Sequence, residues 1–120
     1  MNHEFREGTN AKEEFIKHTA YCKVKCAIVT QQDIYFRVFA DKTDLEDDNV
    51  FKLPIGYTEE EYQAFLNHLD FEYDDGYGSQ QLFGTIWMED GTWLTRGEYG
   101  GSEWWEVHSR PSVPSVLTIN

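Results

Sequence analysis

Two carboxylates near the C-terminal end of the chain, Glu98 and Glu103, have the spacing that points most directly to chemistry. They flank Gly100-Gly101, which has the composition of a two-residue hairpin turn, so we expect their side chains to lie across from each other on adjacent strands. Like charges in that arrangement repel. Two interpretations stay open: both carboxylates point into water with Arg96 as a diagonal neighbour, or they share a proton or bind a cationic group of a partner.

An enzyme would use this pair as general acid and base, with His108 nearby. No nucleophile or metal pattern accompanies the pair in the sequence, so we predict a non-enzymatic protein without catalytic residues. His18, Cys22 and Cys26 are evenly spaced, but they lack the paired ligands of a zinc knuckle. The two cysteines are therefore expected to be free thiols.

The acidic loop predicted at residues 41–50 also has a spacing that suggests metal binding. Asp44, Glu46 and Asp48 alternate as in a calcium loop, but the sixth position has no glycine and Ile55 stands where the twelfth-position glutamate belongs. The acidic residues that precede Gly76 fail in a similar way. We predict no metal and no cofactor, and interpret the loop as solvated or in contact with a basic partner.

The charge of the chain is concentrated in one region. The net charge is −12; residues 1–43 carry six acids and seven bases, whereas residues 44–106 carry sixteen acids and only Lys52 and Arg96 as bases. A field of this sign repels nucleic acid and anionic membranes, and it attracts proteins with basic grooves.

A three-stranded antiparallel meander is predicted for residues 81–107, which hold all four tryptophans. Asp-Gly at 90–91 and Gly-Gly at 100–101 are both typical of two-residue hairpin turns. A two-residue loop at 90–91 places Met88 across from Trp93 and Ile86 across from Thr95 on one side of the sheet, and Trp87 across from Leu94 on the other side.

The same register predicts two contacts between the last strands. Arg96 faces Trp105, so its guanidinium is expected to stack on the indole, with Glu98 or Glu103 as an ionic partner. Trp104 is expected to cover Gly97 and a neighbouring glycine, Gly84, because a large ring shields the backbone that strand glycines leave bare.

The remaining elements are two helices and an N-terminal hairpin. Residues 10–20 fit a helix capped by Thr9 or Asn10, and residues 58–70 fit a second helix in which Thr58 and Glu61 form a capping box. We predict an α+β fold: an antiparallel sheet of about five strands, made of a hairpin and the C-terminal meander, with two helices packed on one face. Residues 1–110 form the single domain, and residues 111–120 an extended or flexible arm. The predicted strands lie near 22–30, 34–40, 81–89, 92–99 and 102–107.

The run FGTIWMEDGTWLTRGEYGGSEWWE, residues 83–106, resembles a C-terminal hairpin of small proteins from tailed bacteriophages. The run LPIGYTEEEYQAFLNHLDFEYDDGYG, residues 53–78, shares the resemblance to a lesser degree. The resemblance implies a phage setting, and it implies no catalytic residue.

We therefore expect a non-enzymatic inhibitor that imitates DNA and docks a carboxylate-rich surface into the basic groove of a host nucleic-acid-handling protein, such as a restriction, recombination, transcription or CRISPR protein. The alternative is an interaction module or homodimer built through exposed aromatic residues, including Phe83. The chain lacks a long apolar run and a signal peptide, so we expect it in the cytoplasm of the host cell. The candidate partner-binding residues are Asp44, Glu46, Asp47, Asp48, Glu59, Glu60, Asp74, Asp75, Glu98, Glu103, Trp87 and Trp105.

Overall fold

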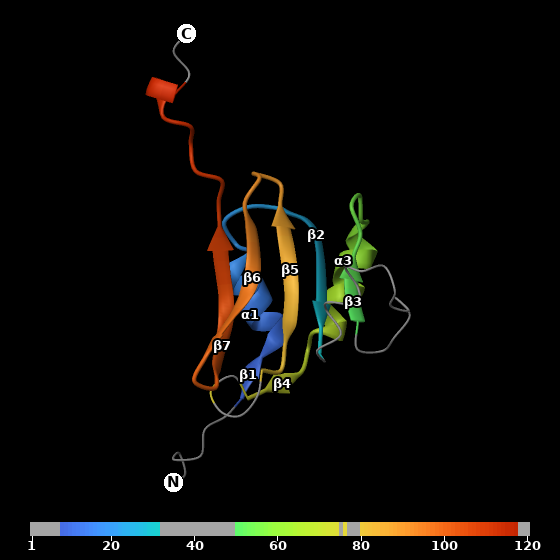
Figure 1. Ribbon diagram of the computed structural model, residues 1–120. Helices are drawn as coiled ribbons and strands as arrows, with labels where there is room; N and C mark the ends of the chain where they lie inside the picture. Colours follow the sequence, from blue (N-terminus) through green and yellow to red (C-terminus); the bar gives the residue numbers. More distant parts are fainter. Residues whose placement is uncertain (1–7, 32–49, 75, 77–79, 118–120) are drawn as a thin grey trace.

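The computed structural model describes residues 8–31, 50–74, 76 and 80–117, and in this part the chain forms two antiparallel sheets and two α-helices (Figure 1). The larger sheet has five strands in the order β3-β2-β5-β6-β7, and the smaller sheet pairs β1 with β4. The predicted α+β fold is confirmed. The elements are β1 Thr9–Asn10, α1 Ala11–His18, β2 Val24–Thr30, β3 Val50–Leu53, α3 Glu59–His68, β4 Glu72–Tyr73, β5 Phe83–Met88, β6 Trp93–Tyr99, β7 Ser102–His108 and the 3₁₀ turn η1 Ser115–Leu117.

The strand that pairs with the outer side of β2 is β3, which the sequence analysis did not predict. The strand predicted near residues 34–40 lies outside the described residues. The short run Val50–Leu53 is apolar at three of four positions, and its buried residues Phe51 and Leu53 pack into the core. The pattern is too brief to separate from a loop by periodicity alone.

Both helices begin where their capping residues predict. The Asn10 side chain accepts the backbone N–H of Glu13 at the start of α1. At the start of α3, Thr58 Oγ1 accepts the N–H of Glu61 at 3.1 Å, and the Glu61 carboxylate accepts the N–H of Thr58 at 2.8 Å. These bonds satisfy backbone donors that have no partner within the helix, so they fix the first turn of each helix.

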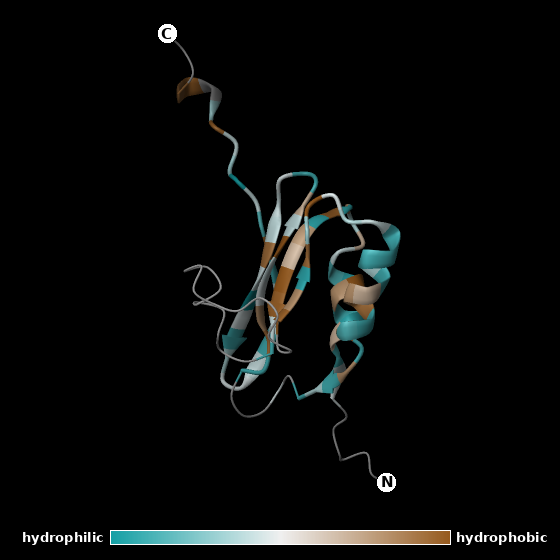
Figure 2. Cartoon of the chain, turned by 90° about the vertical axis from the view of Figure 1, so that its right-hand side faces the viewer, coloured by the Kyte–Doolittle hydropathy of each residue, from teal (hydrophilic) through white to brown (hydrophobic). Residues whose placement is uncertain are grey.

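The core lies between one face of the sheet and the two helices, which both cover that face (Figures 1 and 2). Phe15 of α1 and Phe65 of α3 meet edge to face, with ring centroids 5.2 Å apart. Ile86 and Leu94, from neighbouring strands, are fully buried beneath them. Within the described part of the chain, no helix lies on the other face of the sheet, which we call the open face.

The register between β5 and β6 differs from the predicted one. Ile86 pairs with Leu94 and Trp87 pairs with Trp93, so the prediction that Met88 faces Trp93 is wrong. The loop contains three residues, 89–91, instead of two: Met88 N donates to Thr92 O, and Gly91 closes the turn with φ of 91°. One extra loop residue shifts the pairing by one and moves every side chain of the strand to the other face.

The register between β6 and β7 is the predicted one. Arg96 pairs with Trp105, Gly97 with Trp104 and Glu98 with Glu103. Gly100 and Gly101 form the two-residue turn, with φ of 61° and 93°. A Cβ on Gly97 would lie 2.6 Å from Trp104 Nε1, so the indole does cover this glycine. Gly84 is not its neighbour, because the shift in β5 turns Gly84 toward the core.

Candidate protein-binding surfaces

A buried ionic cluster lies where α1 crosses β6 and β7. The Arg96 side chain is 2% exposed, and its Nη2 donates to Glu103 Oε1 at 2.6 Å and to the Tyr73 hydroxyl at 2.9 Å. Its Nη1 lies 3.4 Å from Glu14 Oε1, and its guanidinium carbon lies 4.9 Å from the Trp105 ring centroid. The predicted stacking on Trp105 and ionic pairing with Glu103 are therefore confirmed.

The neighbours of this guanidinium keep it charged. Burial by itself disfavours the charge on Arg96, but Tyr73, Glu14 and Glu103 outweigh that effect and raise its pKa above the ordinary value. Burial, together with the hydrogen bond to Glu14, raises the pKa of the Tyr73 hydroxyl, which therefore stays protonated. The Tyr73 hydroxyl donates to Glu14 at 2.5 Å. The cluster ties α1, the end of β4 and the last two strands together.

Two predicted contact residues, Glu103 and Trp105, belong to this buried cluster. Glu103 is 3% exposed, and besides Arg96 it accepts the backbone N–H groups of Gln81 and Leu82 at 2.7 and 3.0 Å. Trp105 is 5% exposed, so the prediction that it forms an exposed patch is wrong. Both side chains point to the helix-covered face, because the strand alternates and its neighbours point the other way. Neither is accessible to a partner.

The residues proposed for acid–base chemistry do not converge. Glu98 is exposed at the end of β6, whereas Glu103 is buried against Arg96. His108 lies on the open face, where its Nε2 is 2.8 Å from Thr95 Oγ1 and its ring stacks on Trp93. Glu98 and Glu103 are cross-strand partners on one face of the sheet, but Glu103 is held by Arg96, and His108 lies on the other face, so the three groups do not converge on one point.

Exposed carboxylates gather at the end of the molecule that holds β1, β4 and the β6–β7 turn (Figure 1). The Asn10 amide donates to Asp70 Oδ1 at 3.0 Å and to Glu72 Oε2 at 3.2 Å, so these two carboxylates lie close together. Lys12 is 4.0 Å from Asp70 and offsets part of this charge. We call this region the carboxylate end; its exposed acids are Glu13, Asp70, Glu72, Asp74 and Glu98.

A polar groove of about 440 Å³ opens at the carboxylate end, between α1 and β7. Glu13, Glu14 and Glu103 contribute to its lining, together with Lys17 and His18. Its volume is within the range of small-ligand sites and of pockets for single side chains. Glu14 and Glu103 are buried and paired with Arg96, so Glu13 is the exposed carboxylate of this lining, opposed by Lys17.

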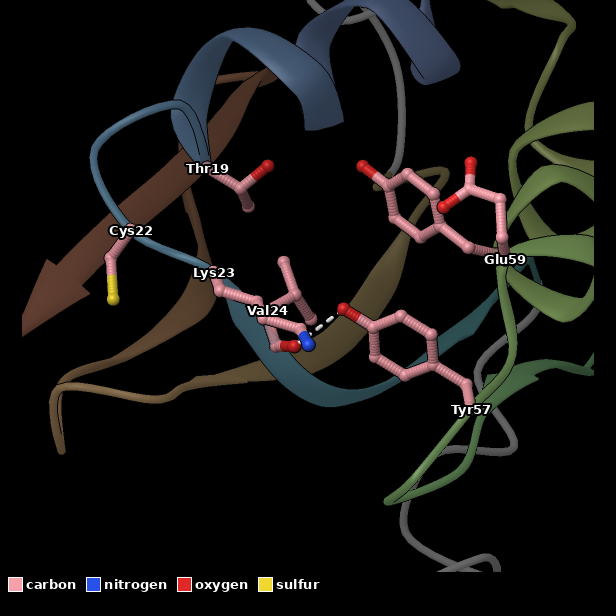
Figure 3. A pocket seen from close by; sticks show the side chains of 7 residues that line it. Thr19, Cys22, Lys23, Val24, Tyr57 and Glu59 are labelled. Atoms are coloured by element: carbon pink, nitrogen blue, oxygen red, sulfur yellow. Dashed lines mark hydrogen bonds between the residues drawn. The ribbon is translucent and has the colours of Figure 1, made fainter.

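The predicted contact residues Glu59 and Glu60 lie at the opposite end of the sheet, at the start of α3. Tyr57 lies just before this helix, and its hydroxyl donates to the carbonyl oxygen of Val24, the first residue of β2, at 2.7 Å. Glu59 helps to line a pocket of about 350 Å³ there, beside Lys23 and the Tyr57 ring (Figure 3). The described candidate acids therefore lie at two ends of the molecule and do not form one continuous surface.

The open face carries three of the four tryptophans. Trp87, Trp93 and His108 form a row across β5, β6 and β7, and the Trp93 and His108 rings stack with centroids 5.7 Å apart. Trp104 lies two positions from Glu106 on β7, and its Nε1 donates to the Glu106 carboxylate at 2.9 Å. All three indoles are half-buried. Trp87 is the predicted contact residue that this face retains.

Some predicted site residues are not described, and some observed ones were not predicted. Asp44, Glu46, Asp47, Asp48 and Asp75 lie outside the described residues. Sequence reasoning missed Glu13, Asp70 and Glu72 as members of one cluster, and it missed Trp93 and Trp104 as partners of Trp87. The sequence shows the acidic spacing of residues 70–75, which resembles an incomplete calcium loop. It does not show that these residues lie beside α1, because that proximity results from the pairing of β1 with β4.

Within the described ranges, no group of three His, Cys, Asp or Glu residues is placed to hold a metal ion. Cys22 and Cys26 are free and half-buried, and burial raises the pKa of Cys26. No helix among the described residues has the length and apolar character to span a membrane. Searches against protein-family models, curated proteins and solved structures find no match to this chain.

Proposed function

We propose that this chain is a non-enzymatic inhibitor that binds the basic, nucleic-acid-binding groove of a host protein through its carboxylate end. The observation that carries the proposal is the convergence of exposed carboxylates around the start of α1, where one Asn10 amide bridges Asp70 and Glu72. The adjoining groove, which has the exposed Glu13 in its lining, gives a basic side chain of the partner a place to enter. The net charge of −12 favours encounter with a positively charged surface.

The proposal is narrower than the sequence alone suggested. Glu59 and Glu60 lie at the start of α3 and Asp70 lies just beyond its end, about 16 Å away along the helix axis, so a single flat partner surface does not need to contact both ends. The Asn10 amide already holds Asp70 and Glu72 close together in the free protein. The partner therefore does not have to bring two repelling carboxylates together when it binds, which lowers the free-energy cost of binding. Partner residues of the arginine and lysine type then replace the water around them.

The experiment compares two charge-neutralised triple variants. One carries Asp70→Asn, Glu72→Gln and Glu98→Gln at the carboxylate end, and the matched control carries Glu59→Gln, Glu60→Gln and Glu89→Gln, which are exposed residues at the other end. Host nucleic-acid-binding proteins are captured on the immobilised wild-type chain, and duplex DNA is then added as a competitor.

We expect DNA to displace the captured protein, binding to weaken as salt rises, and only the carboxylate-end variant to lose binding. Binding that withstands high salt and excess DNA would contradict inhibition by mimicry. Equal loss in both variants would show that total charge, and not the carboxylate end, controls binding.

A second candidate function is interaction through aromatic residues. The observation that favours it is the row formed by Trp87, Trp93 and His108 on a sheet face without a covering helix in the described part of the chain. Tryptophan is enriched at the energetic centres of protein interfaces.

A further inference from the structure

The C-terminal arm, residues 109–117, extends away from the domain (Figures 1 and 2). Three of its apolar side chains are highly exposed: Val113 at 64%, Val116 at 68% and Leu117 at 72%. Pro111 and Pro114 are three residues apart, so they would lie on one face of the segment if it bound as a polyproline II helix, which has three residues per turn; Ser115–Leu117 after them form the 3₁₀ turn η1. Exposed apolar residues on an extended segment mark it as a segment that docks onto another surface.

The open face has the chemistry that proline-containing segments require. Such segments bind grooves lined by aromatic rings, and a carboxylate beside the rings would attract a basic residue that flanks the prolines. Here the rings are Trp87, Trp93 and Trp104, and Glu106 lies beside Trp104. Arg110 immediately precedes the first proline of the arm.

We propose that the arm of one copy of this chain docks onto the open face of a second copy, and that the second arm docks reciprocally. Two features of the same chain are complementary: an arm with Arg110, prolines and exposed valines, and a face with tryptophans and Glu106. The arm starts directly after His108, at the end of the aromatic row, and it continues away from its own sheet (Figure 1). A two-fold axis near this point gives each arm the other face, which is the symmetry that closes a dimer.

The junction between face and arm is concave. A pocket of about 450 Å³ lies there, and its lining includes Asp90, Trp93 and Arg110. The chain's own Arg110 lies with Asp90 in this lining, so in the dimer an apolar side chain from the second copy's arm would rest against the Trp93 ring, while Glu106 attracts the second copy's Arg110. This inference deepens the second candidate function and is independent of the carboxylate end.

Salt separates this inference from the proposed inhibitor function. Each copy carries a net charge of −12, so like charges oppose the dimer, and salt screens that repulsion. Apolar contacts between arm and face are not weakened by moderate salt. The dimer is therefore expected to strengthen as salt rises, whereas binding to a basic partner weakens.

The experiment measures the mass of the full chain by sedimentation velocity over a range of concentrations at low and high salt. The test variants are a chain truncated after Ser109 and the substitution Leu117→Ser; the matched control is Ile55→Ser, which alters a residue of similar exposure, 69%, in the turn before α3. The arm lies outside the core, so these variants should keep the wild-type circular dichroism. A Trp93→Ala variant tests the face.

We expect a dimer that becomes at least about tenfold weaker in the truncated chain and the Trp93→Ala variant, with little change in Ile55→Ser. A chain that is monomeric at every concentration and salt level overturns the proposal, and it would indicate that the arm binds a groove on a different protein. A dimer that persists unchanged after truncation also overturns it. Neither result bears on the carboxylate-end variants, whose binding is measured separately.

Discussion

Replacing Arg96 with methionine should reveal how strongly the buried ionic cluster holds the domain together. The guanidinium is 2% exposed and pairs with Glu103, which is fully buried, and with Glu14, which is 8% exposed. Methionine fills much of the same volume but leaves both carboxylates in the core without a cation. The structure thus predicts a large loss of stability for a single substitution on one strand.

The size of the loss follows from what remains after the change. Removing one partner of a buried ion pair costs about 3–5 kcal/mol, because the remaining charge is uncompensated in a medium of low dielectric. Glu103 retains two backbone N–H donors, from Gln81 and Leu82, which reduces its share of the cost. Glu14 retains the Tyr73 hydroxyl. We therefore expect a decrease of about 3–4 kcal/mol in the free energy of unfolding, a large fraction of the roughly 5–15 kcal/mol typical of domains.

Urea denaturation followed by tryptophan fluorescence measures this loss. The control is Arg110→Met, which removes the same group from an exposed position and should change the free energy of unfolding by less than about 0.5 kcal/mol. A double variant, Arg96→Met with Glu103→Gln, should lose less than the two single losses added together, because each single change already breaks the shared pair. A loss below about 1 kcal/mol for Arg96→Met would refute the reasoning, since that value is typical of a solvent-exposed pair.

Three further predictions concern strand glycines, a helix cap and alkaline pH. Gly84→Ala should lower the free energy of unfolding by roughly 2–3 kcal/mol, because a Cβ there overlaps the backbone of β2. Gly97→Ala should lower it by about 1 kcal/mol or less, because the side chain of Trp104 can move. Thermal denaturation ranks the two variants. Thr58→Ala should lower the free energy of unfolding by about 1 kcal/mol through loss of the capping box, measured in urea, and Thr58→Ser should restore it. Folding raises the pKa of Tyr73, so its contribution to the free energy of unfolding is complete below the unfolded pKa of about 10 and is lost as pH rises through the folded pKa. Unfolding curves measured between pH 8 and 11 should therefore show that the free energy of unfolding decreases with pH. The decrease should be shallower in Tyr73→Phe, which has no hydroxyl to ionise.

The parts of the fold that the sequence predicts correctly are those set by local signals. Gly100-Gly101 forms a two-residue turn with positive φ at both positions, and this loop length determines the pairing of Arg96 with Trp105 and of Glu98 with Glu103. The capping residues Asn10 and Thr58 likewise mark the helix starts without reference to the rest of the chain. Once the last hairpin was in register, the contact between Arg96 and Trp105 followed.

The turn at Asp90-Gly91 shows where local signals end. The same dipeptide serves a two-residue loop and the last two positions of a three-residue loop whose final glycine has positive φ. The structure has the longer loop, with the Asp90 carboxylate accepting both the N–H and the hydroxyl of Thr92. The single-residue difference moves Trp87 to the open face beside Trp93. Sequence pattern alone therefore divided the tryptophans between two faces, and the loop length brings three of them together.

The location of Arg96 also explains why the exterior is so acidic. It is the one lysine or arginine between residues 53 and 106, and the fold places it inside, between Glu14 and Glu103. The exposed carboxylates of that stretch therefore receive no local cation from it, and those at the carboxylate end depend on Lys12 and on the Asn10 amide. The burial of Arg96 therefore keeps its positive charge away from the described exposed carboxylates of this stretch, which supports the proposal that they meet a basic partner.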